Sequence, residues 1–274
     1  MINRISVVVP VYNSKDILPE LYERLLIVLE REGSDFELIF VDDGSKDESW
    51  SVIKELAIGD ERLRGFRLTR NFGQHNALFA GFNQATGDTI VTLDDDLQNP
   101  PEEIPLLLNK LSEGFELVYG IPVVRQHNVW RNIGSRIILV SLMTVLGLQS
   151  AGRVSSYRIF DATLVDSLRA NSRPRMSIDV LLSWATSEIS SCPVKHESRR
   201  SGKSNYSVFR LLSHSVDVIS GFSVLPLRIV AFLGVVFSFA GVTMLSYILG
   251  RYLLQGSTVP GFPMLATMIS IFSG

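Results

Sequence analysis

The chain has 274 residues, with 26 basic and 28 acidic side chains and a mean hydropathy of +0.23. This near balance excludes the strongly basic footprint of a nucleic-acid-binding protein, so no nucleic-acid partner is expected. A single cysteine, Cys192, excludes an internal disulfide and fits a reducing compartment. The histidines are far apart and lack metal-binding spacing, so a zinc site is not expected.

Residues 1–120 alternate between short apolar runs and amphipathic segments. The apolar runs predict strands at residues 4–11, 36–41, 64–69, 88–93 and 115–119. Helices are expected between them: one ends at Gly33, an alanine-rich one stops at Gly87, and one runs from Pro101 to about Leu111. This alternation predicts an α/β domain, a mostly parallel sheet with helices on both faces.

Polar residues at the strand-to-helix turns suit helix capping. Ser14 or Asp16 is expected to cap the first helix, and Ser45 or Asp47 the second. Gly44 allows the tight turn that the second strand needs before its helix.

Three consecutive acids, Asp94, Asp95 and Asp96, follow the predicted strand at residues 88–93. The carboxyl ends of strands in an α/β sheet are where such folds bind ligands. Asp94 and Asp96 are two residues apart, so on an extended backbone they point the same way and can hold a hard divalent cation that bridges to phosphates. A solvated acidic turn is the alternative interpretation.

A second predicted strand, residues 36–41, also ends in acids, Asp42 and Asp43. Two such strand ends would crowd several carboxylates around one crevice, where they repel one another. Mg²⁺ or Mn²⁺ bound with a nucleotide diphosphate would complete the cluster most simply. Helix capping explains Asp47 but not five acids at two strand ends.

Beyond residue 122, arginines flank an apolar segment at residues 137–148. It is too short to span a bilayer, which needs about 20 residues, and is either a core helix or a segment in the membrane interface. A strand carrying Arg158 is expected at residues 153–160. Helices are expected at about 162–170 and 177–187, and a last strand at 189–198.

The basic loop at residues 198–206 suits a phosphate, with a solvated loop as the alternative. An amphipathic segment and an uncharged stretch, residues 229–250, follow; the latter is long enough to span a membrane. Basic residues are denser before this span, which places the preceding domain in the cytoplasm. No cleavable signal peptide is expected before the first strand.

This patterning predicts five regions along the chain. Residues 1–204 form the catalytic domain, 205–227 an amphipathic juxtamembrane region and 228–250 a transmembrane helix. Residues 251–261 form a loop, and 262–274 the start of a second, truncated span, with a re-entrant or interfacial tail as the alternative.

Five motifs together identify a family. They are Val9–Asn13, Val41–Ser45, Arg70–His75, Leu93–Glu102 and Arg199–Tyr206. In this order, ahead of a membrane anchor, they resemble the membrane-anchored family 2 glycosyltransferases that act on polyprenyl phosphates. This family includes dolichyl-phosphate mannose synthases, bactoprenyl-phosphate glucosyltransferases and undecaprenyl-phosphate formamido-arabinose transferases. The last branch is the most similar.

The resemblance implies a GT-A fold, a nucleotide-diphosphate-sugar donor, Mg²⁺ or Mn²⁺, and a polyprenyl (undecaprenyl) phosphate acceptor. It further implies a lipid membrane as partner, the inner (plasma) membrane with a cytoplasmic catalytic domain, and self-association into a homo-oligomer. The product would be a lipid-linked sugar for cell-envelope glycan modification.

The resemblance assigns roles on the donor side. Pro10 and Tyr12 would line the base pocket, and Asp42 would bind the base or ribose. Asp43 and Asp95 would complete the nucleotide-sugar-binding set.

The resemblance also assigns the catalytic set. Asp94 would be the first acid of a D-x-D motif, Asp96 the metal ligand, and Gln98 a neighbour of the metal and the sugar. Arg158 would neutralise phosphate charge between donor and acceptor. The lipid phosphate would be bound by Arg131, Ser135, Arg199 and Lys203.

The chain departs from the family pattern at several positions. Ser14 stands where the family usually has Glu, and Asp95 where it usually has Ala. The basic loop carries Lys203 two places from the usual cation, and no acid shortly precedes Arg158.

A phosphate acceptor is already an anion, so single displacement with inversion needs no dedicated general base. Two alternatives stay open. One is a glycosyltransferase with a hydroxyl acceptor, although the Gln-x-x-Arg-Trp motif of processive synthases is absent from the sequence. The other is a non-catalytic, membrane-anchored nucleotide-sugar-binding protein.

Overall fold

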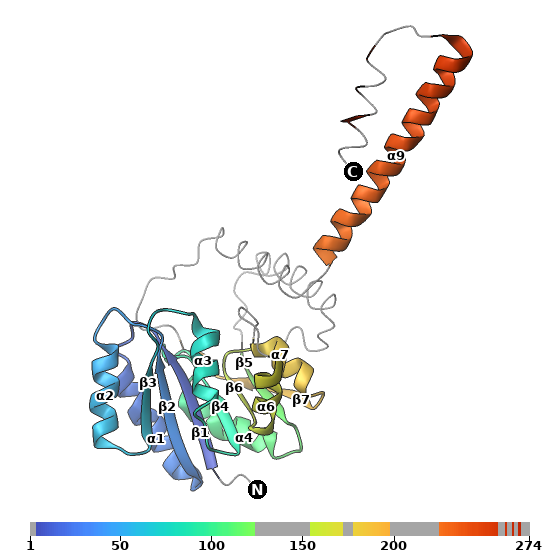
Figure 1. The fold of residues 1–274 in the computed structure, drawn as a ribbon. Coiled ribbons are helices and arrows are strands. Elements are labelled where there is room, and N and C mark those ends of the chain that lie inside the picture. The colour runs from blue at the N-terminus through green and yellow to red at the C-terminus, as the bar shows by residue number, and fades with distance from the viewer. Residues whose placement is uncertain are drawn as a thin grey trace. The chain divides into compact units, whose positions relative to one another are not determined.

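The computed structural model describes residues 4–123, 154–171, 178–197 and 225–256, with Gly261, Leu265, Met268 and Ile269 (Figure 1). Two compact units divide the chain, Met1–Asn205 and Tyr206–Gly274. Most of the described residues belong to the first unit, which carries all of the strands described below.

A seven-stranded mixed sheet forms the centre of the first unit, in the order β3-β2-β1-β4-β6-β5-β7. Strand β6 runs antiparallel to both of its neighbours, and the other paired strands are parallel. The strands are β1 (Arg4–Val11), β2 (Asp35–Asp42), β3 (Leu63–Arg67), β4 (Thr89–Thr92), β5 (Leu117–Pro122), β6 (Arg158–Asp161) and β7 (Ile189–Val194). Each strand predicted from the sequence is confirmed at its place along the chain, with ends that differ by a few residues.

Helices cover both faces of the sheet, as predicted (Figure 1). One layer packs on the core cluster around Val7 and Phe40, and the other on the cluster around Val8 and Phe160. The first layer contains α1 (Leu18–Glu32), α2 (Ser49–Gly59), and α4 (Ile104–Leu111) with the 3-10 turn η1 (Pro101–Glu103). The second contains α3 (Gln74–Phe82), α6 (Thr163–Asn171) and α7 (Ile178–Ala185).

The local signals explain how these helices are placed. The leucines of α1 recur at helical spacing and are buried, and Gly33 ends the helix in the left-handed conformation (φ 72). Gly81 lets α3 lie close over β1, because a Cβ there would come within 2.3 Å of Val8 Cγ1. This close approach brings the start of α3 over the carboxyl edge of the sheet.

The expected caps of the first helix are wrong, because Ile17 stands at the N-cap of α1 and makes no side-chain cap bond. At the second helix Glu48 stands at the N-cap, but the expected Asp47 does accept the backbone N–H of Ser49, the first residue of α2, at 3.0 Å. The Ser14 hydroxyl, one of the expected caps, instead donates to the Asp95 carboxylate from a different loop. A long-range partner therefore outcompeted the local capping role.

Helix α3 ends at Phe82, earlier than the predicted stop at Gly87. Thr86 donates its backbone N–H to the Glu37 carboxylate, and Gly87 donates its own to the Ser6 hydroxyl. These bonds hold the segment on the sheet and remove its N–H groups from helix formation.

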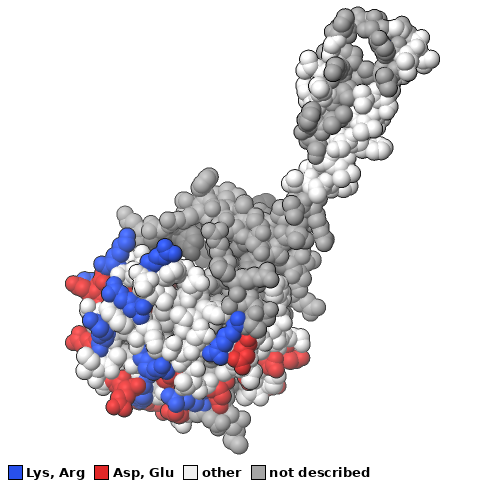
Figure 2. Space-filling view, in the orientation of Figure 1, with Lys and Arg blue, Asp and Glu red and all other residues white. Residues whose placement is uncertain are grey.

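In the second unit, α9 (Leu225–Gln255) is a helix of 31 residues. By length and composition, its window Val230–Tyr247, with a mean hydropathy of 1.9, could cross a membrane. Most of its large apolar side chains are exposed, including Phe237, Phe239 and Leu254. The surface of α9 that faces the viewer in Figure 2 is uncharged, although Arg251 near its carboxyl end is exposed, whereas the first unit mixes acidic and basic side chains.

Candidate active site

Four loops meet at the carboxyl edge of the sheet, because β1, β2, β3 and β4 run parallel and end together. We call them the first loop (residues 12–15, after β1), the second loop (43–48, after β2), the third loop (68–73, after β3) and the acidic turn (93–98, after β4). Hydrogen bonds join the first loop to the second, the second to the third, and the acidic turn both to the first loop and to the start of the helix that follows the third loop.

The first and second loops are joined through Asn13, which has a left-handed backbone (φ 56). Its N–H donates to Ser45 Oγ at 3.0 Å, and its side-chain Oδ1 accepts from the Lys46 N–H at 2.8 Å. The Ser14 N–H adds a bond of 2.8 Å to Ser49 Oγ at the start of α2. Asparagine tolerates this backbone conformation better than most residues. At this position both the backbone and the side chain of Asn13 bond to the second loop.

Asp43 joins the second loop to the third. Its carboxylate accepts the backbone N–H groups of Phe72 at 2.7 Å and Gly73 at 2.8 Å. Burial, with a contribution from the charge of Asp42, raises the pKa of Asp43, although these two bonds act in the other direction. Gly44 is required beside it, since its φ is +68 and a Cβ would lie 2.6 Å from the Arg70 backbone.

Asp94 joins the acidic turn to the helix that follows the third loop. Gln74 Nε2 donates to Asp94 Oδ1 and Ser156 Oγ donates to Asp94 Oδ2, both at 2.5 Å. Burial raises the pKa of Asp94, and the nearby charge of Asp96 raises it further. Both hydrogen-bond donors are neutral, and the positive charge of Arg158 only partly offsets the effect of burial and of Asp96 on the pKa of Asp94.

Asp95 joins the acidic turn to the first loop by hydrogen bonds. Its Oδ2 accepts from the Tyr12 N–H at 2.9 Å and from Ser14 Oγ at 2.5 Å. Burial, and then the neighbouring charges of Asp94 and Asp96, raise its pKa to about 6. Two positions at which the sequence leaves the family pattern, Ser14 and Asp95, are thus in direct contact.

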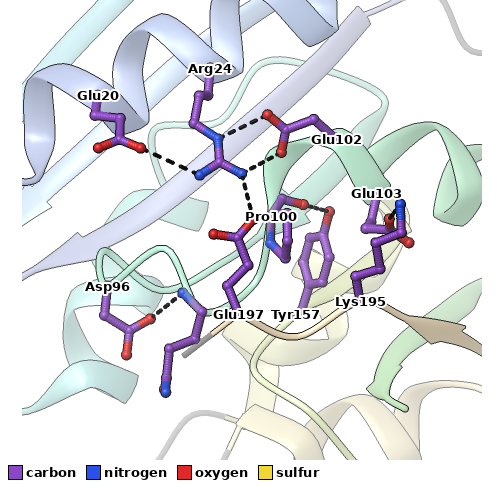
Figure 3. Close-up of polar contacts among 10 residues, drawn as sticks. Glu20, Arg24, Asp96, Pro100, Glu102, Glu103, Tyr157, Lys195 and Glu197 are labelled. Carbon is purple, nitrogen blue, oxygen red and sulfur yellow. Dashed lines mark hydrogen bonds and ion pairs between the residues drawn. The ribbon is translucent and has the colours of Figure 1, made fainter. Parts of the chain in front are cut away.

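Asp96 is buried and its Oδ1 accepts the backbone N–H of Gln98 at 3.1 Å (Figure 3). Leu97 between them has a left-handed backbone (φ 57), which turns the chain sharply. The sharp turn at Leu97 therefore folds the backbone of Gln98 back onto the carboxylate of Asp96.

The segment after the acidic turn is held by side chains from three directions (Figure 3). Arg24 of α1 binds both carboxylate oxygens of Glu102, at 2.9 and 2.7 Å, and reaches Glu197 at 3.3 Å. Tyr157 donates its hydroxyl to the Pro100 carbonyl at 3.1 Å. A two-point arginine–carboxylate pair fixes geometry as well as charge, so this segment is firmly oriented.

Glu197 links this segment to the last described residues of the first unit. Its backbone N–H donates to the Gln98 carbonyl at 2.9 Å. Residue 197 immediately precedes the basic loop at 198–206 in the sequence. The chain therefore enters that loop from a point beside Gln98.

Asp42 is fully buried at the end of β2. Its Oδ1 accepts the Ser45 N–H at 3.0 Å, and its Oδ2 lies 3.0 Å from Nε of Arg67. Arg67 is the register partner of Asp42 on β3 and is 46% exposed. Pro10 is buried beside this pair of strands, whereas Tyr12 is 41% exposed at the rim.

Arg158 is 1% exposed and held from two sides. Its Nε donates to Thr92 Oγ1 at 3.1 Å, and its Nη1 forms an ion pair with Asp179 of α7. Tyr119 donates its hydroxyl to the same carboxylate at 3.3 Å. The acid missing from the sequence just before Arg158 has a counterpart in Asp179, which a different element supplies.

Several site neighbours were missed by sequence reasoning. They are Arg67, Gln74, Ser156 and Asp179. Gln74 lies within a quoted motif, and Arg67 lies within the strand predicted at residues 64–69, so both belong to segments that the sequence had marked. Nothing local marks Ser156 or Asp179, which are far from the acidic turn in sequence.

A divalent cation fits the pair Asp94 and Asp96. Carboxylate oxygens are the ligands that Mg²⁺ and Mn²⁺ prefer, and the raised pKa of Asp94 shows an electrostatic deficit that a cation would offset. Over the described ranges, no group of three or more histidine, cysteine, aspartate or glutamate side chains could hold a metal ion. The remaining ligands would therefore come from phosphates and water, as is usual for Mg²⁺.

Four of the predicted site residues lie outside the described part of the chain. They are Arg131, Ser135, Arg199 and Lys203. The same holds for the apolar segment at residues 137–148 and the amphipathic segment at 206–222. The other predicted residues all lie on the carboxyl edge or directly below it.

Comparison with known sequences gives a consistent result. The family model "Glycosyl transferase family 2" matches residues 6–168. The undecaprenyl-phosphate 4-deoxy-4-formamido-L-arabinose transferase of Enterobacter sp. (strain 638) is 36% identical over 244 residues, which is 89% of this chain and 75% of that protein. The enzyme of the same name from Salmonella paratyphi B is 36% identical over 245 residues, with the same coverage.

Solved structures match the fold. Glucosyl-3-phosphoglycerate synthase from Mycobacterium tuberculosis, in complex with Mn²⁺, UDP and glucosyl-3-phosphoglycerate, has a TM-score of 0.59 at 23% identity. The match covers 79% of this chain and 77% of that one. The same enzyme with Mn²⁺, UDP and phosphoglyceric acid has a TM-score of 0.60 at 23% identity and covers 79% and 76%.

Proposed function

The chain belongs to glycosyl transferase family 2, and from this premise we propose that it transfers a sugar from a nucleotide-diphosphate sugar to a polyprenyl phosphate. The fold is the α/β GT-A fold expected from the sequence. In the relatives that are 36% identical, the acceptor named is undecaprenyl phosphate, and we propose the same acceptor for this chain. The product would be a lipid-linked sugar for modifying cell-envelope glycans.

The observation that carries the proposal is the pairing of Asp94 and Asp96 on one bend at the carboxyl edge. Burial, and then the charge of Asp96, raises the pKa of Asp94, and a bound cation would offset both effects. Such a pair serves the release of a diphosphate, because charge grows on the leaving group as the glycosidic bond breaks. A purely structural acidic turn would gain nothing from burying these groups together.

On the donor side, the buried Asp42 and the exposed ring of Tyr12 are proposed to bind the nucleoside. Asp42 Oδ2 has no hydrogen bond to a described residue, although Arg67 offsets its charge. A nucleobase or ribose donor group would satisfy that oxygen. Asp43, whose carboxylate holds the third loop, supports this end of the site through the backbone.

Asp94 and Asp96 are proposed to hold Mg²⁺ or Mn²⁺, with Asp96 as the principal ligand. When bound, the cation offsets the charge of the departing nucleoside diphosphate. Gln98, whose backbone is fixed by Asp96 and Glu197, would contact the sugar. Arg158 contributes a buried positive charge behind the acidic turn.

On the acceptor side, a phosphate oxygen is the proposed nucleophile, and attack from the face opposite the leaving group inverts the anomeric carbon. We propose that Arg131, Ser135, Arg199 and Lys203 bind this phosphate. The bond between Glu197 and Gln98 supports the part played by the basic loop, because it starts that loop at the catalytic edge.

We propose that the enzyme binds its lipid-linked acceptor at the membrane surface. We propose that α9 contains the transmembrane helix expected at residues 228–250, and that the catalytic domain faces the cytoplasm at the inner (plasma) membrane. The exposed apolar side chains of α9 support a lipid environment. We propose the same limits as the sequence predicts for the other regions: the catalytic domain at residues 1–204, the juxtamembrane region at 205–227, the loop at 251–261 and the start of a second span at 262–274. We also propose that the protein self-associates through its transmembrane segments.

A hydroxyl acceptor would need a general base. Asp179 is the acid that contacts Arg158, but its carboxylate is already engaged by Arg158 and by the hydroxyl of Tyr119. This pairing favours the phosphate acceptor, which arrives already ionised.

The test mixes the full-length protein in detergent with a radiolabelled nucleotide sugar, Mn²⁺ and undecaprenyl phosphate. Label extracted into the organic phase, in a product of inverted configuration, is the expected result. Label in polymer or soluble glycan would indicate a hydroxyl acceptor, and no transfer with any donor would indicate a binding protein. Asp96→Asn should lower the transfer rate by about 10²–10³-fold, while the surface variant Asp166→Asn on α6 should retain the wild-type rate.

A further inference from the structure

Asp95 stands between the two proposed metal-binding acids, but its carboxylate is committed elsewhere. Its Oδ2 accepts two hydrogen bonds, from the Tyr12 N–H at 2.9 Å and from Ser14 Oγ at 2.5 Å. Both donors belong to the first loop, more than 80 positions earlier in the chain. Asp94 has different partners, Gln74 Nε2 and Ser156 Oγ, so the two neighbouring carboxylates are engaged by separate parts of the chain.

The location of these bonds matters because the sheet no longer holds the two loops together there. The parallel register between β1 and β4 ends at Val8 and Thr92. Strand β1 continues to Val11 alongside β2 alone. Past that point the two bonds to Asp95 join the first loop to the acidic turn where the ladder has ended.

We propose that Asp95 is a positioning residue: it fixes the first loop against the acidic turn and so sets the spacing between the nucleoside-binding end and the diphosphate-binding end of the donor site. This inference rests on the proposed function. A nucleotide diphosphate has a fixed reach between base and phosphates, so both ends bind well only when their spacing is correct. Asp95 acts through Tyr12 and Ser14, without contacting the donor.

The alternative role for Asp95 is electrostatic, as a third negative charge beside the metal. The two roles make different demands on the side chain. Positioning requires an acceptor oxygen, which asparagine also has, whereas an electrostatic role requires the charge itself. The contact with Ser14 allows a second test of the positioning role, because its hydroxyl can be removed without changing a residue of the acidic turn.

The experiment uses the full-length protein in detergent with Mn²⁺. UDP, GDP, CDP and dTDP are titrated into the wild type by calorimetry, and the tightest of them becomes the probe. Asp95→Ala should weaken its binding by about tenfold, Ser14→Ala by about threefold, and Asp95→Asn by less than about threefold. In the transfer assay, Asp95→Ala should raise the donor KM by more than it lowers kcat.

Two further measurements separate positioning from general damage. Adding Ser14→Ala to Asp95→Ala should weaken binding no further, because the shared bond is already lost. Asp166→Ala, which removes an exposed carboxylate of α6, should leave binding unchanged. Thermal unfolding of each variant shows whether it is folded, and Ser14→Ala provides the test if Asp95→Ala is not.

The outcomes that overturn the inference are distinct. Unchanged nucleotide affinity in both Asp95→Ala and Ser14→Ala would exclude positioning. Equal losses in Asp95→Asn and Asp95→Ala, with an altered Mn²⁺ requirement, would assign Asp95 to the metal site. If the wild type bound no nucleoside diphosphate at all, the proposed function would fail and this inference with it.

Discussion

Buried carboxylates lie at both ends of the sheet, and they are in opposite electrostatic states. At the amino end, Glu37 on β2 is 2% exposed. It accepts from Ser6 Oγ at 2.7 Å, from the Thr86 N–H at 2.7 Å and from Arg64 Nη1 at 3.1 Å. Burial alone would raise the pKa of Glu37, but these bonds outweigh it, and the pKa lies below its ordinary value.

At the carboxyl end, Asp94 and Asp95 also accept hydrogen bonds, but burial and mutual repulsion prevail and their pKa values are raised. The difference lies in the donors. Glu37 has a cation, Arg64, whereas the bonds to Asp94 and Asp95 come from neutral groups. The carboxylate at the amino end has a cation bonded to it, whereas the acidic turn at the carboxyl end has only the nearby charge of Arg158, so a bound cation would stabilise it. The four predictions below test this contrast.

The largest effect is expected for Asp96→Asn. Removing the principal ligand of the proposed cation should lower the transfer rate by about 10²–10³-fold, because charge on the leaving diphosphate is no longer offset. Folding should be retained, since one source of repulsion in the acidic turn is lost. The measurement is the initial rate of label transfer to undecaprenyl phosphate, beside a thermal unfolding curve. A nearly normal rate would remove Asp96 from the catalytic set.

Glu37→Gln should produce the opposite pattern. The glutamine amide places a donor against Arg64 and removes the charge that this arginine pairs with, so we expect a loss of about 2–3 kcal/mol in the free energy of unfolding. Activity of the folded fraction should be close to that of the wild type. Denaturant unfolding followed by circular dichroism measures the loss.

Glu113→Gln is the matched control for this substitution. It also removes one glutamate of an ion pair, but on the exposed end of α4, where the effect should be below about 1 kcal/mol. Equal losses of unfolding free energy in Glu37→Gln and Glu113→Gln would mean that the buried ion pair at the amino end stabilises the fold no more than an exposed ion pair does.

Binding of a cation should stabilise the carboxyl end alone. Mn²⁺ at about ten times its dissociation constant should add about 1.4 kcal/mol to the stability of the wild type. Asp94→Asn and Asp96→Asn should lose this gain, and Glu37→Gln should keep it. The midpoint of thermal unfolding with Mn²⁺ or with a chelator reports the difference. An equal gain in Asp96→Asn would place the cation elsewhere.

The sequence predicted most of the framework because its signals are local. Apolar runs marked the strands, and acids directly after two of them marked the edge of the sheet where the loops meet. The antiparallel placement of β6 between β4 and β5 was not predicted, because strand order depends on packing that no local pattern encodes.

The internal contacts of the site were beyond the reach of the sequence. Gln74 with Asp94, and Ser14 with Asp95, pair residues from separate loops, 20 and 81 positions apart. The helix-cap prediction for Ser14 was wrong for the same reason, since a local rule cannot weigh a distant carboxylate. From the sequence Asp95 was assigned to the nucleotide-sugar-binding set, and its bonds to Tyr12 and Ser14, which support the positioning role proposed above, carry no local signal.

The smallest effect concerns the pH dependence of the amino end. A carboxyl with a folded-state pKa below its unfolded value of 4.5 contributes stability that is fully present above that value. As pH falls through the lowered folded-state pKa, Glu37 takes up a proton and this contribution is lost. Glu37→Gln cannot titrate, so its stability deficit relative to the wild type should be largest near pH 7 and shrink as pH falls below about 4.5. Denaturant midpoints of both proteins, measured in parallel at pH 7, 5 and 4, follow this change. A deficit that stayed constant would show that the neutral hydrogen bonds, and not the charge paired with Arg64, stabilise this end of the sheet.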